Sequence, residues 1–247
     1  MTLMKNNILS FFNLLKPPLK TLRRIFYSGN NRFCPVCECS SSAFLPLGQR
    51  ADARCVVCGS LERHRLLWTF LKEKTDLFDD QIKQILHIAP ELCFESRLRK
   101  KFANSYITAD LLAPSAMVKM DITCIQYPDQ SFDVILCSHV LEHIQDDKQA
   151  MKEIYRVLKN DGFAILIVPI SDKEKTFEDP SIVSPQERLK YFGQEDHVRI
   201  YGLDYIDRLC DAGFKVSVTS VKDLCSEETA DLMGLTIASG NIYKCTK

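Results

Sequence analysis

The stretch QILHIAPE at residues 84–91 decides the fold. It begins with a short apolar run, which is the pattern of a buried strand. Pro90 then stands at the favoured first-turn position of a helix that we expect to continue to about Phe102. A second apolar run at residues 105–109 ends at Asp110. A strand, a helix and a strand in this order predict a parallel βαβ unit.

The same alternation continues to the end of the chain. The apolar periodicity predicts a helix at residues 61–78 and, beyond the first βαβ unit, strands at 118–120, 132–137, 163–168, 214–221 and 235–245 with helices at 146–158 and 203–212. This pattern predicts an α/β fold with a doubly wound, mostly parallel sheet and an antiparallel strand at its C-terminal end.

Two cysteine motifs of identical spacing precede this alternation. The motifs CPVC (residues 34–37) and CVVC (residues 55–58) are separated by 17 residues. Four thiolates at this spacing suit one tetrahedral Zn²⁺. We therefore expect a structural zinc, because four sulfur ligands leave no open position for catalysis; the ligands would be Cys34, Cys37, Cys55 and Cys58. Cys39 is near enough to exchange into this site, and a disulfide framework is the alternative.

Length and cysteine usage set the outer bounds. A chain of 247 residues has room for one domain of ordinary size and a small metal-bound module. We expect a basic and apolar N-terminal segment (residues 1–32), a zinc-binding module (33–60) and the α/β domain (61–247). Eleven cysteines, an odd number, fit complete disulfide pairing poorly and favour a reducing cytoplasm.

The formal net charge is zero, but the charges are unevenly distributed. Residues 1–65 hold ten Lys and Arg against three Asp and Glu, and the remainder holds twenty-two against twenty-nine. A basic part of this kind can meet anionic lipid, nucleic acid or an acidic partner. Its apolar stretch at residues 8–15 is too short to span a bilayer, but it suits weak peripheral contact with the inner membrane face. Packing against protein is the alternative.

Two aspartates mark a candidate ligand site, because ligands of a doubly wound sheet bind beyond the carboxyl ends of its strands. Asp110 follows the first turn by about twenty residues, the distance at which an acidic side chain accepts hydrogen bonds from a ribose. Asp121 ends the next strand, where it can accept from an exocyclic amine while Ile122 packs on a purine. Each aspartate alone is more typical of a turn or helix cap. Together, in this order, they favour nucleoside binding.

Four motifs stand out in the centre of the chain: MDI (residues 120–122), YPDQSFDVI (127–135), HVLEHI (139–144) and YRVLKNDG (155–162). Together they resemble the central run of the class I S-adenosylmethionine-dependent methyltransferases. From Cys34 on, the chain is also similar to a bacterial subgroup with an N-terminal zinc-ribbon-like module, through CGSLERHR (58–65) and GQEDHVR (193–199). The resemblance implies a Rossmann-like, seven-stranded methyltransferase sheet within residues 61–247.

The resemblance also implies S-adenosylmethionine as the cofactor. The implied cofactor contacts follow the strands: His87, Ala89, Pro90, Glu91, Asp110, Leu111, Asp121, Ile122, Ser138 and His139. The first turn departs from the family pattern, because His87 stands at the usual acidic position and Ala89 and Glu91 stand at glycine positions. We interpret this as a subgroup variant in which Glu91 meets the ammonium group of the cofactor. A domain that no longer binds the cofactor is the alternative.

Histidines are the candidate bases. His139 follows the fourth strand, near where the methyl group is expected to point, whereas His143 is expected to pack or cap. A long polar connection at residues 170–200 is typical of a functional loop. Near its end a carboxylate can orient His197 as a general base, and an arginine can hold an anionic substrate. The expected substrate contacts are Glu195, Asp196, His197, Arg199 and Tyr201.

The sequence thus predicts a methyltransferase that uses S-adenosylmethionine and acts on an oxygen of a small-molecule or glycan-type acceptor, with His197 and His139 as catalytic candidates. One alternative is a ribosomal RNA methyltransferase whose zinc module binds RNA. The basic first 65 residues favour it, but they lack the interleaved aromatic and basic residues that stack on bases. The other alternative is a non-catalytic, zinc-stabilised adaptor.

Overall fold

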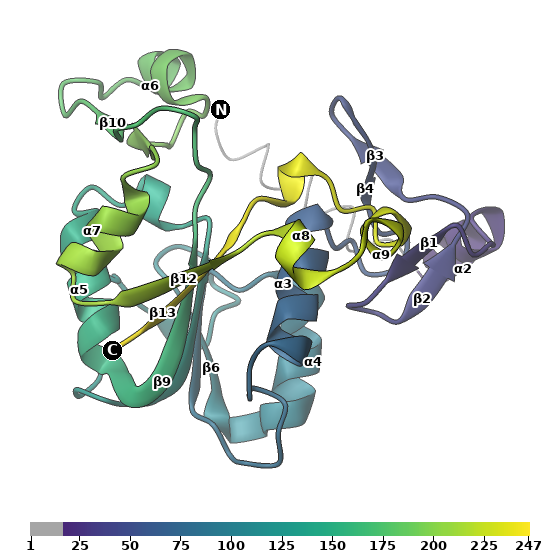
Figure 1. The fold of residues 1–247 in the computed structure, drawn as a ribbon, viewed down its shortest axis with the longest axis horizontal. Coiled ribbons are helices and arrows are strands. Elements are labelled where there is room, and N and C mark those ends of the chain that lie inside the picture. Colours follow the sequence, from purple (N-terminus) through teal and green to yellow (C-terminus); the bar gives the residue numbers. More distant parts are fainter. Residues whose placement is uncertain (1–16) are drawn as a thin grey trace. The chain divides into compact units, whose positions relative to one another are not determined.

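The computed structural model describes residues 17–247, and the apolar stretch at 8–15 lies outside them. The chain forms two compact units (Figure 1). One runs to Thr75 and takes in Val221–Ser239, and the other comprises Asp76–Ser220 and Gly240–Lys247. They are named here the cysteine unit and the sheet unit. In the part that the structure describes, every helix falls short of the length and apolar character needed to cross a membrane.

The cysteine unit is built from short hairpins and helices. Its elements are α2 (Pro17–Phe26), β1 (Arg32–Cys34), β2 (Cys39–Ser41), β3 (Leu45–Leu47), β4 (Arg50–Arg54), α3 (Glu62–Glu73), α8 (Val221–Leu224), α9 (Glu227–Leu232) and the 3₁₀ turn η3 (Ile237–Ser239). β1 pairs with β2 and β3 pairs with β4, both antiparallel. Two-stranded hairpins of this length are marginally stable in water, so they depend on what links them.

Arg65 links these pieces from the inside. Its side chain is fully buried on α3. The guanidinium donates hydrogen bonds to four backbone carbonyl oxygens, those of Ala53, Ser60, Met233 and Gly234. A buried charge needs such partners, and two of them come from the segment between α9 and η3. This explains why that distant segment belongs to the cysteine unit.

The sheet unit contains one seven-stranded sheet in the order β12-β13-β9-β8-β5-β6-β7. The strands are β5 (Ile85–Ile88), β6 (Tyr106–Asp110), β7 (Val118–Lys119), β8 (Phe132–Ser138), β9 (Leu158–Ile167), β12 (Lys215–Thr219) and β13 (Ile242–Thr246). The strands from β5 to β9 pair in parallel. β13 is antiparallel to both of its neighbours. The predicted fold class, an α/β protein with a seven-stranded, mostly parallel sheet, is confirmed.

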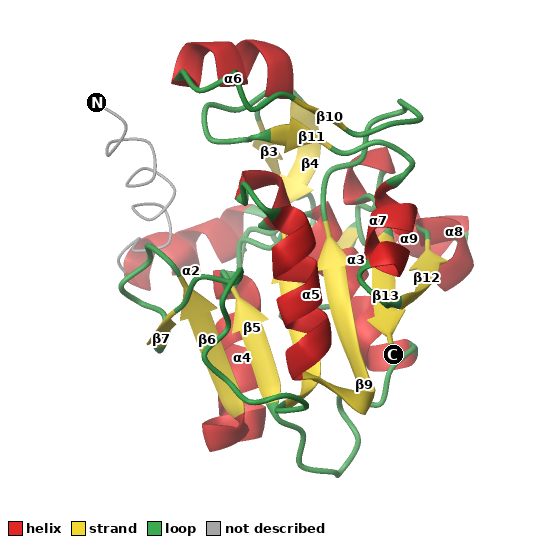
Figure 2. Cartoon of the chain, turned by 90° about the vertical axis from the view of Figure 1, so that its left-hand side faces the viewer, coloured by secondary structure: helices red, strands yellow, loops and turns green. Residues whose placement is uncertain are grey.

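Helices cover both faces of this sheet. α5 (Asp147–Val157) and α7 (Tyr205–Asp211) lie on one face, and α4 (Leu92–Phe102) lies on the other (Figures 1 and 2). α5 shows the local cause, since Ala150, Met151, Ile154 and Val157 form one buried stripe at helical spacing. The side chain of Asp146 caps the helix by accepting a hydrogen bond from a backbone amide of its first turn.

The structure differs from the sequence prediction at the last strand. A strand was expected over residues 235–245, but β13 begins at Ile242. Met233 and Gly234 are hydrogen-bonded to Arg65 of the cysteine unit, so the residues that follow them turn through η3 before the sheet resumes. An apolar pattern alone does not show which partner it packs against.

The long connection after β9 has structure of its own. It contains β10 (Phe177–Glu178), α6 (Pro185–Phe192) and β11 (Arg199–Ile200), and β10 pairs with β11 antiparallel. Ser184 caps α6, and Gly193 ends the helix with a left-handed φ of 83°. The connection therefore returns as an ordered arm that brings residues 195–201 back to the sheet unit.

Candidate functional site

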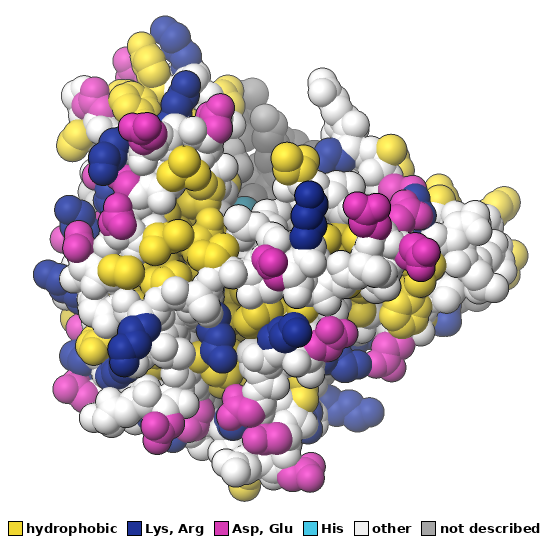
Figure 3. Space-filling view, viewed as in Figure 1, with side chains coloured by type: hydrophobic (Ala, Val, Ile, Leu, Met, Phe, Trp, Pro, Cys, Tyr) yellow, Lys and Arg dark blue, Asp and Glu magenta, His cyan; other side chains and the backbone are white. Residues whose placement is uncertain are grey.

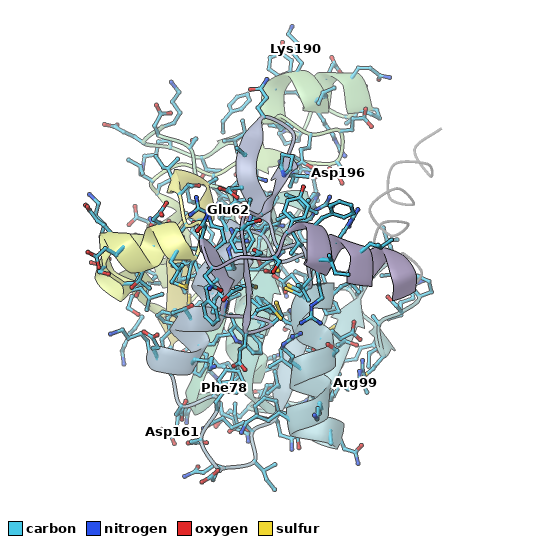
Figure 4. All side chains as sticks on the ribbon, turned by 90° about the vertical axis from the view of Figure 1, so that its right-hand side faces the viewer. Glu62, Phe78, Arg99, Asp161, Lys190 and Asp196 are labelled. Atoms are coloured by element: carbon cyan, nitrogen blue, oxygen red, sulfur yellow. The ribbon has the colours of Figure 1, made fainter. Side chains whose placement is uncertain are left out.

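The candidate site lies at the carboxyl ends of three neighbouring strands. β5 stands between β6 and β8, and both pairs are parallel, so the three strands end at the same edge of the sheet. Ala89, Asp110 and Ser138 lie at these ends. Figure 4 shows Lys190 of α6 and Asp196 at one end of the sheet unit, and Asp161 and Phe78 at the other.

The turn after β5 keeps the backbone form of a glycine turn without a glycine. Ala89 has a φ of 47°, in the left-handed region that glycine favours. The fully buried His87 lies between two partners: Nδ1 is 2.7 Å from the Tyr106 hydroxyl, and Nε2 is 2.5 Å from Oε2 of Glu91. His87 therefore fixes the carboxylate of Glu91 close to the strand end.

The two aspartates cap their own turns. Oδ1 of Asp110 accepts hydrogen bonds from the backbone amides of Leu112 and Ala113, both at 2.7 Å. Oδ1 of Asp121 accepts from the amide and hydroxyl of Thr123 at 2.9 and 2.7 Å. Among the described residues, Asp110 makes its hydrogen bonds through Oδ1, which leaves Oδ2 for a ligand. The turn and cofactor interpretations of these residues are thus compatible.

The hydrophobic residues beside them differ in exposure. Leu111 is exposed after β6, whereas Ile122 is packed in the core of the sheet unit. Ser138 ends β8 and is buried. An exposed leucine can cover a bound adenine, while Ile122 can support it only from within the core.

A buried carboxylate orients the histidine that follows β8. His139 has a φ of 57°, and its amide donates to the carbonyl of Ile167 at 2.8 Å. Its Nδ1 lies 3.2 Å from Oε1 of Glu142, whose side chain is 1% exposed. Oε2 of Glu142 is buried and has no hydrogen-bond partner among the described residues. A positive φ on a non-glycine residue marks a conformation that the surrounding structure must hold.

Two more histidines stand beside Glu142. The rings of His143 and His197 pack edge to face, with centroids 4.7 Å apart at 83°. Ligand atoms of Glu142, His143 and His197 all lie within 4.8 Å of one another. Burial, and to a smaller degree the neighbouring His143, lowers the pKa of His197 from its ordinary value.

Arg199 and Tyr201 hold the polypeptide around this cluster. Arg199 is 2% exposed; it donates to the carbonyl oxygens of Leu141, Ile144 and Gln145, and its Nε lies 2.9 Å from Glu178. The hydroxyl of Tyr201 donates to Asp147 at 2.6 Å. Both side chains make these hydrogen bonds to the protein itself. Glu195 and Asp196 are exposed.

The sequence prediction included His139 and His197 but not Glu142 or the role of His143. Glu142 lies three residues after His139, in the 3₁₀ turn of residues 141–143, and side chains at this separation are often close together. That spacing was the available signal. The proximity of Glu142 to His197 had no signal in the sequence, because more than fifty residues separate these two positions.

The four cysteines of the cysteine unit form a compact group. Sγ of Cys34 lies 3.6 Å from Sγ of Cys58, and Sγ of Cys37 lies 3.6 Å from Sγ of Cys55. A tetrahedral zinc with sulfur ligands requires sulfur separations of about 3.8 Å, so this donor set fits one ion. Cys39 is outside the group, and its thiol donates to the carbonyl of Cys37.

The amino-acid sequence of this chain is similar to those of several known proteins. A family model described as "Methyltransferase domain" matches residues 81–166. The uncharacterized protein MJ0638 of Methanocaldococcus jannaschii is 30% identical over 166 residues, which cover 49% of this chain and 73% of that protein. The uncharacterized methyltransferase YcgJ of Bacillus subtilis is 33% identical over 75 residues, covering 30% of this chain and 28% of YcgJ.

A solved structure gives a looser likeness. The S-adenosylmethionine-dependent methyltransferase from Archaeoglobus fulgidus is 15% identical, and the match covers 74% of this chain and 93% of that one with a TM-score of 0.44.

Proposed function

Because this chain belongs to the class I S-adenosylmethionine-dependent methyltransferases, we propose that it methylates an oxygen atom of a small-molecule or glycan-type acceptor. The observation that carries the choice of oxygen is the His139–Glu142 pair beyond β8. A hydroxyl acceptor must lose a proton as it is methylated, and an imidazole held by a carboxylate suits that task.

The residues at the strand ends are proposed to bind the cofactor. S-adenosylmethionine, when bound, supplies an electrophilic methyl group on its sulfonium. Asp110 would hold the ribose hydroxyls through Oδ2, because its Oδ1 accepts from the amides of its own turn. Glu91, fixed by His87, offers a negative charge at the end of β5 to the cofactor's ammonium group. Pro90 has no backbone N–H to donate at this turn, and the acceptor that Glu91 contributes is a different contact.

Changing Asp110 to asparagine tests this placement. We expect the affinity for S-adenosylhomocysteine to fall by about 1.5–3 kcal/mol, because a charged acceptor of the ribose hydroxyls is lost. Isothermal titration measures the loss. Asp161→Asn is the matched control, since Asp161 is exposed at the opposite end of the sheet unit (Figure 4). Unchanged affinity of Asp110→Asn would remove Asp110 from the cofactor site.

His139 is the proposed general base. Glu142 holds Nδ1, so Nε2 is the nitrogen that accepts the proton from the acceptor hydroxyl. His197, which the sequence also suggested as a base, is 5% exposed and packs against His143, so its ring is less open to an acceptor. The exposed Glu195 and Asp196 are proposed to contact the acceptor from the arm after α6.

Replacing His139 with glutamine is expected to lower kcat by about 10²–10⁴-fold, because proton removal is lost while the fold is kept. Single-turnover transfer of a labelled methyl group measures the rate. Lys148→Gln, an exposed change on α5, should leave the rate unchanged. A near-normal rate for His139→Gln would show that another group, or water, takes the proton.

The acceptor class needs its own experiment. Labelled S-adenosylmethionine is incubated with three pools in parallel: phenolic and alcoholic small molecules, oligosaccharides, and ribosomal RNA. Methylated oxygen in either of the first two supports the proposal, and methylated RNA at comparable rates overturns it. On the face of the sheet unit in Figure 3, basic side chains are interspersed with acidic ones, which differs from the basic stripe typical of nucleic-acid binding.

The four-cysteine group is proposed to hold a structural Zn²⁺ through Cys34, Cys37, Cys55 and Cys58. Its support is the set of sulfur separations, together with the absence of any disulfide among the described cysteines. The cytoplasmic setting and the weak membrane-surface contact of residues 1–30 stay predictions from the sequence.

A further inference from the structure

Glu142, His143 and His197 form a second group of metal-ligating side chains, separate from the cysteines. We propose that the sheet unit binds one divalent first-row transition-metal ion through these three residues. Two of the three side chains are buried, and the third, His143, is 32% exposed. The group is therefore buried on the side of Glu142 and His197 and accessible to solvent on the side of His143.

The spacing of the donors is close to that of a coordination shell. The three ligand atoms lie within 4.8 Å of one another. Ligands about 2.0–2.2 Å from one ion stand roughly 3–4 Å apart, so small side-chain rotations bring these donors into place. His143 and Glu142 are neighbours in one 3₁₀ turn, η2 (Leu141–His143), and His197 comes from the arm after α6.

The unpaired oxygen of Glu142 is an independent observation that points to a ligand. Oε1 of Glu142 contacts His139, whereas Oε2 is buried and has no hydrogen-bond partner in the described part of the chain. An unpaired carboxylate oxygen in a protein interior is costly, and a bound cation removes that cost.

Both histidines have the support that metal-ligating imidazoles usually have. Nδ1 of His143 lies 3.3 Å from the carbonyl oxygen of Asp196. His197 has a hydrogen bond to the backbone of Phe192. When one ring nitrogen is held by a backbone carbonyl, the other is left as a lone-pair donor in a fixed direction.

The donor set selects the ion. Two imidazoles and one carboxylate suit Zn²⁺, Mn²⁺, Co²⁺ or Ni²⁺ better than Mg²⁺ or Ca²⁺, which prefer oxygen ligands. Three protein ligands also leave open positions, unlike the four thiolates of the cysteine unit. The role of the ion rests on the proposed function: beside His139, it would bind the acceptor oxygen and lower the pKa of its hydroxyl.

Binding of Mn²⁺ to the zinc-loaded full-length chain tests the site without turnover. Mn²⁺ is chosen because it prefers oxygen and nitrogen ligands over thiolates. Electron paramagnetic resonance measures free Mn²⁺, and Co²⁺ absorption is a second probe, because a His and Glu site lacks sulfur-to-metal charge transfer. We expect one equivalent per chain. His143→Gln and His197→Gln should weaken binding by at least about 100-fold, and Asp172→Asn, a change at another exposed position of the sheet unit, should not.

The result that overturns the proposal is a wild-type chain that binds neither Mn²⁺ nor Co²⁺ beyond its cysteine site, or a His143→Gln chain that binds them normally. His143 is partly exposed, so this variant is expected to fold, and circular dichroism checks it. Full methyl transfer after the ion is removed would contradict only its role at the acceptor. Failure of methyl transfer with every acceptor would leave the binding result intact.

Discussion

Replacing Cys55 with serine is expected to abolish zinc binding by the cysteine unit and to unfold that unit. Apparent binding free energies of structural zinc are about 10–16 kcal/mol, and a hydroxyl does not replace a thiolate ligand. The hairpins β1–β2 and β3–β4 are too short to stand alone, so loss of the proposed ion would leave them with the hydrogen bonds of Arg65 as a link. Elemental analysis measures the zinc, and hydrogen exchange of residues 32–60 reports the unfolding.

Cys39→Ser is the matched control, because Cys39 is the nearest thiol outside the four-sulfur group. This variant should keep one zinc per chain and normal exchange protection. Full zinc content in Cys55→Ser, or loss of zinc in Cys39→Ser, would contradict the assigned ligand set.

Replacing Arg199 with methionine is expected to lower the free energy of unfolding of the sheet unit by about 3–5 kcal/mol. The buried guanidinium donates hydrogen bonds to the carbonyls of Leu141, Ile144 and Gln145. It also pairs with the carboxylate of Glu178 and lies 3.6 Å from that of Asp147. Without it, the buried carbonyl of Leu141 and the partly buried carbonyls of Ile144 and Gln145 lose a donor, which costs more than the ion pair itself contributes. Urea unfolding followed by circular dichroism measures the change.

Arg99→Met provides the comparison for this result. Arg99 also pairs with a carboxylate, Glu95 at 2.7 Å, but its side chain is 42% exposed. An exposed pair of this kind contributes less than about 1 kcal/mol. Equal losses for the two variants would show that burial of Arg199 is not the cause.

Arg199→Met should also slow methyl transfer. The three carbonyls that Arg199 binds flank Glu142 and His143, so the loss of their donor loosens the turn that orients His139. Arg199 is in this sense a positioning residue, although the sequence suggested it as a ligand of an anionic substrate.

Much of the fold was predictable because its causes are local. The apolar run at residues 84–89 forms β5, and the stripe from Ala150 to Val157 forms the buried side of α5. These patterns depend on neighbours within one or two turns of the chain. The two CxxC motifs likewise place their four sulfurs together, as expected from their spacing.

The histidine site was only partly predictable. His139 and His197 were found as single candidates from their places after β8 and in the long connection. Their relation through Glu142 and His143 appears only when the arm after α6 has folded back, with the amide of Val198 donating to the carbonyl of Glu142.

By itself, the sequence of this protein determined the alternating strands and helices, the strand-end aspartates and the cysteine group, since hydrophobic periodicity and motif spacing act over short separations. Three features were decided by the tertiary structure alone. Arg199 is buried and hydrogen-bonded to backbone carbonyls, and Arg65 binds the carbonyls of residues 233–234 within the cysteine unit. Glu142 lies close to His143 and His197. Each of these depends on which distant polar groups are buried together, and burial requires every such group to find a partner in space, not in sequence.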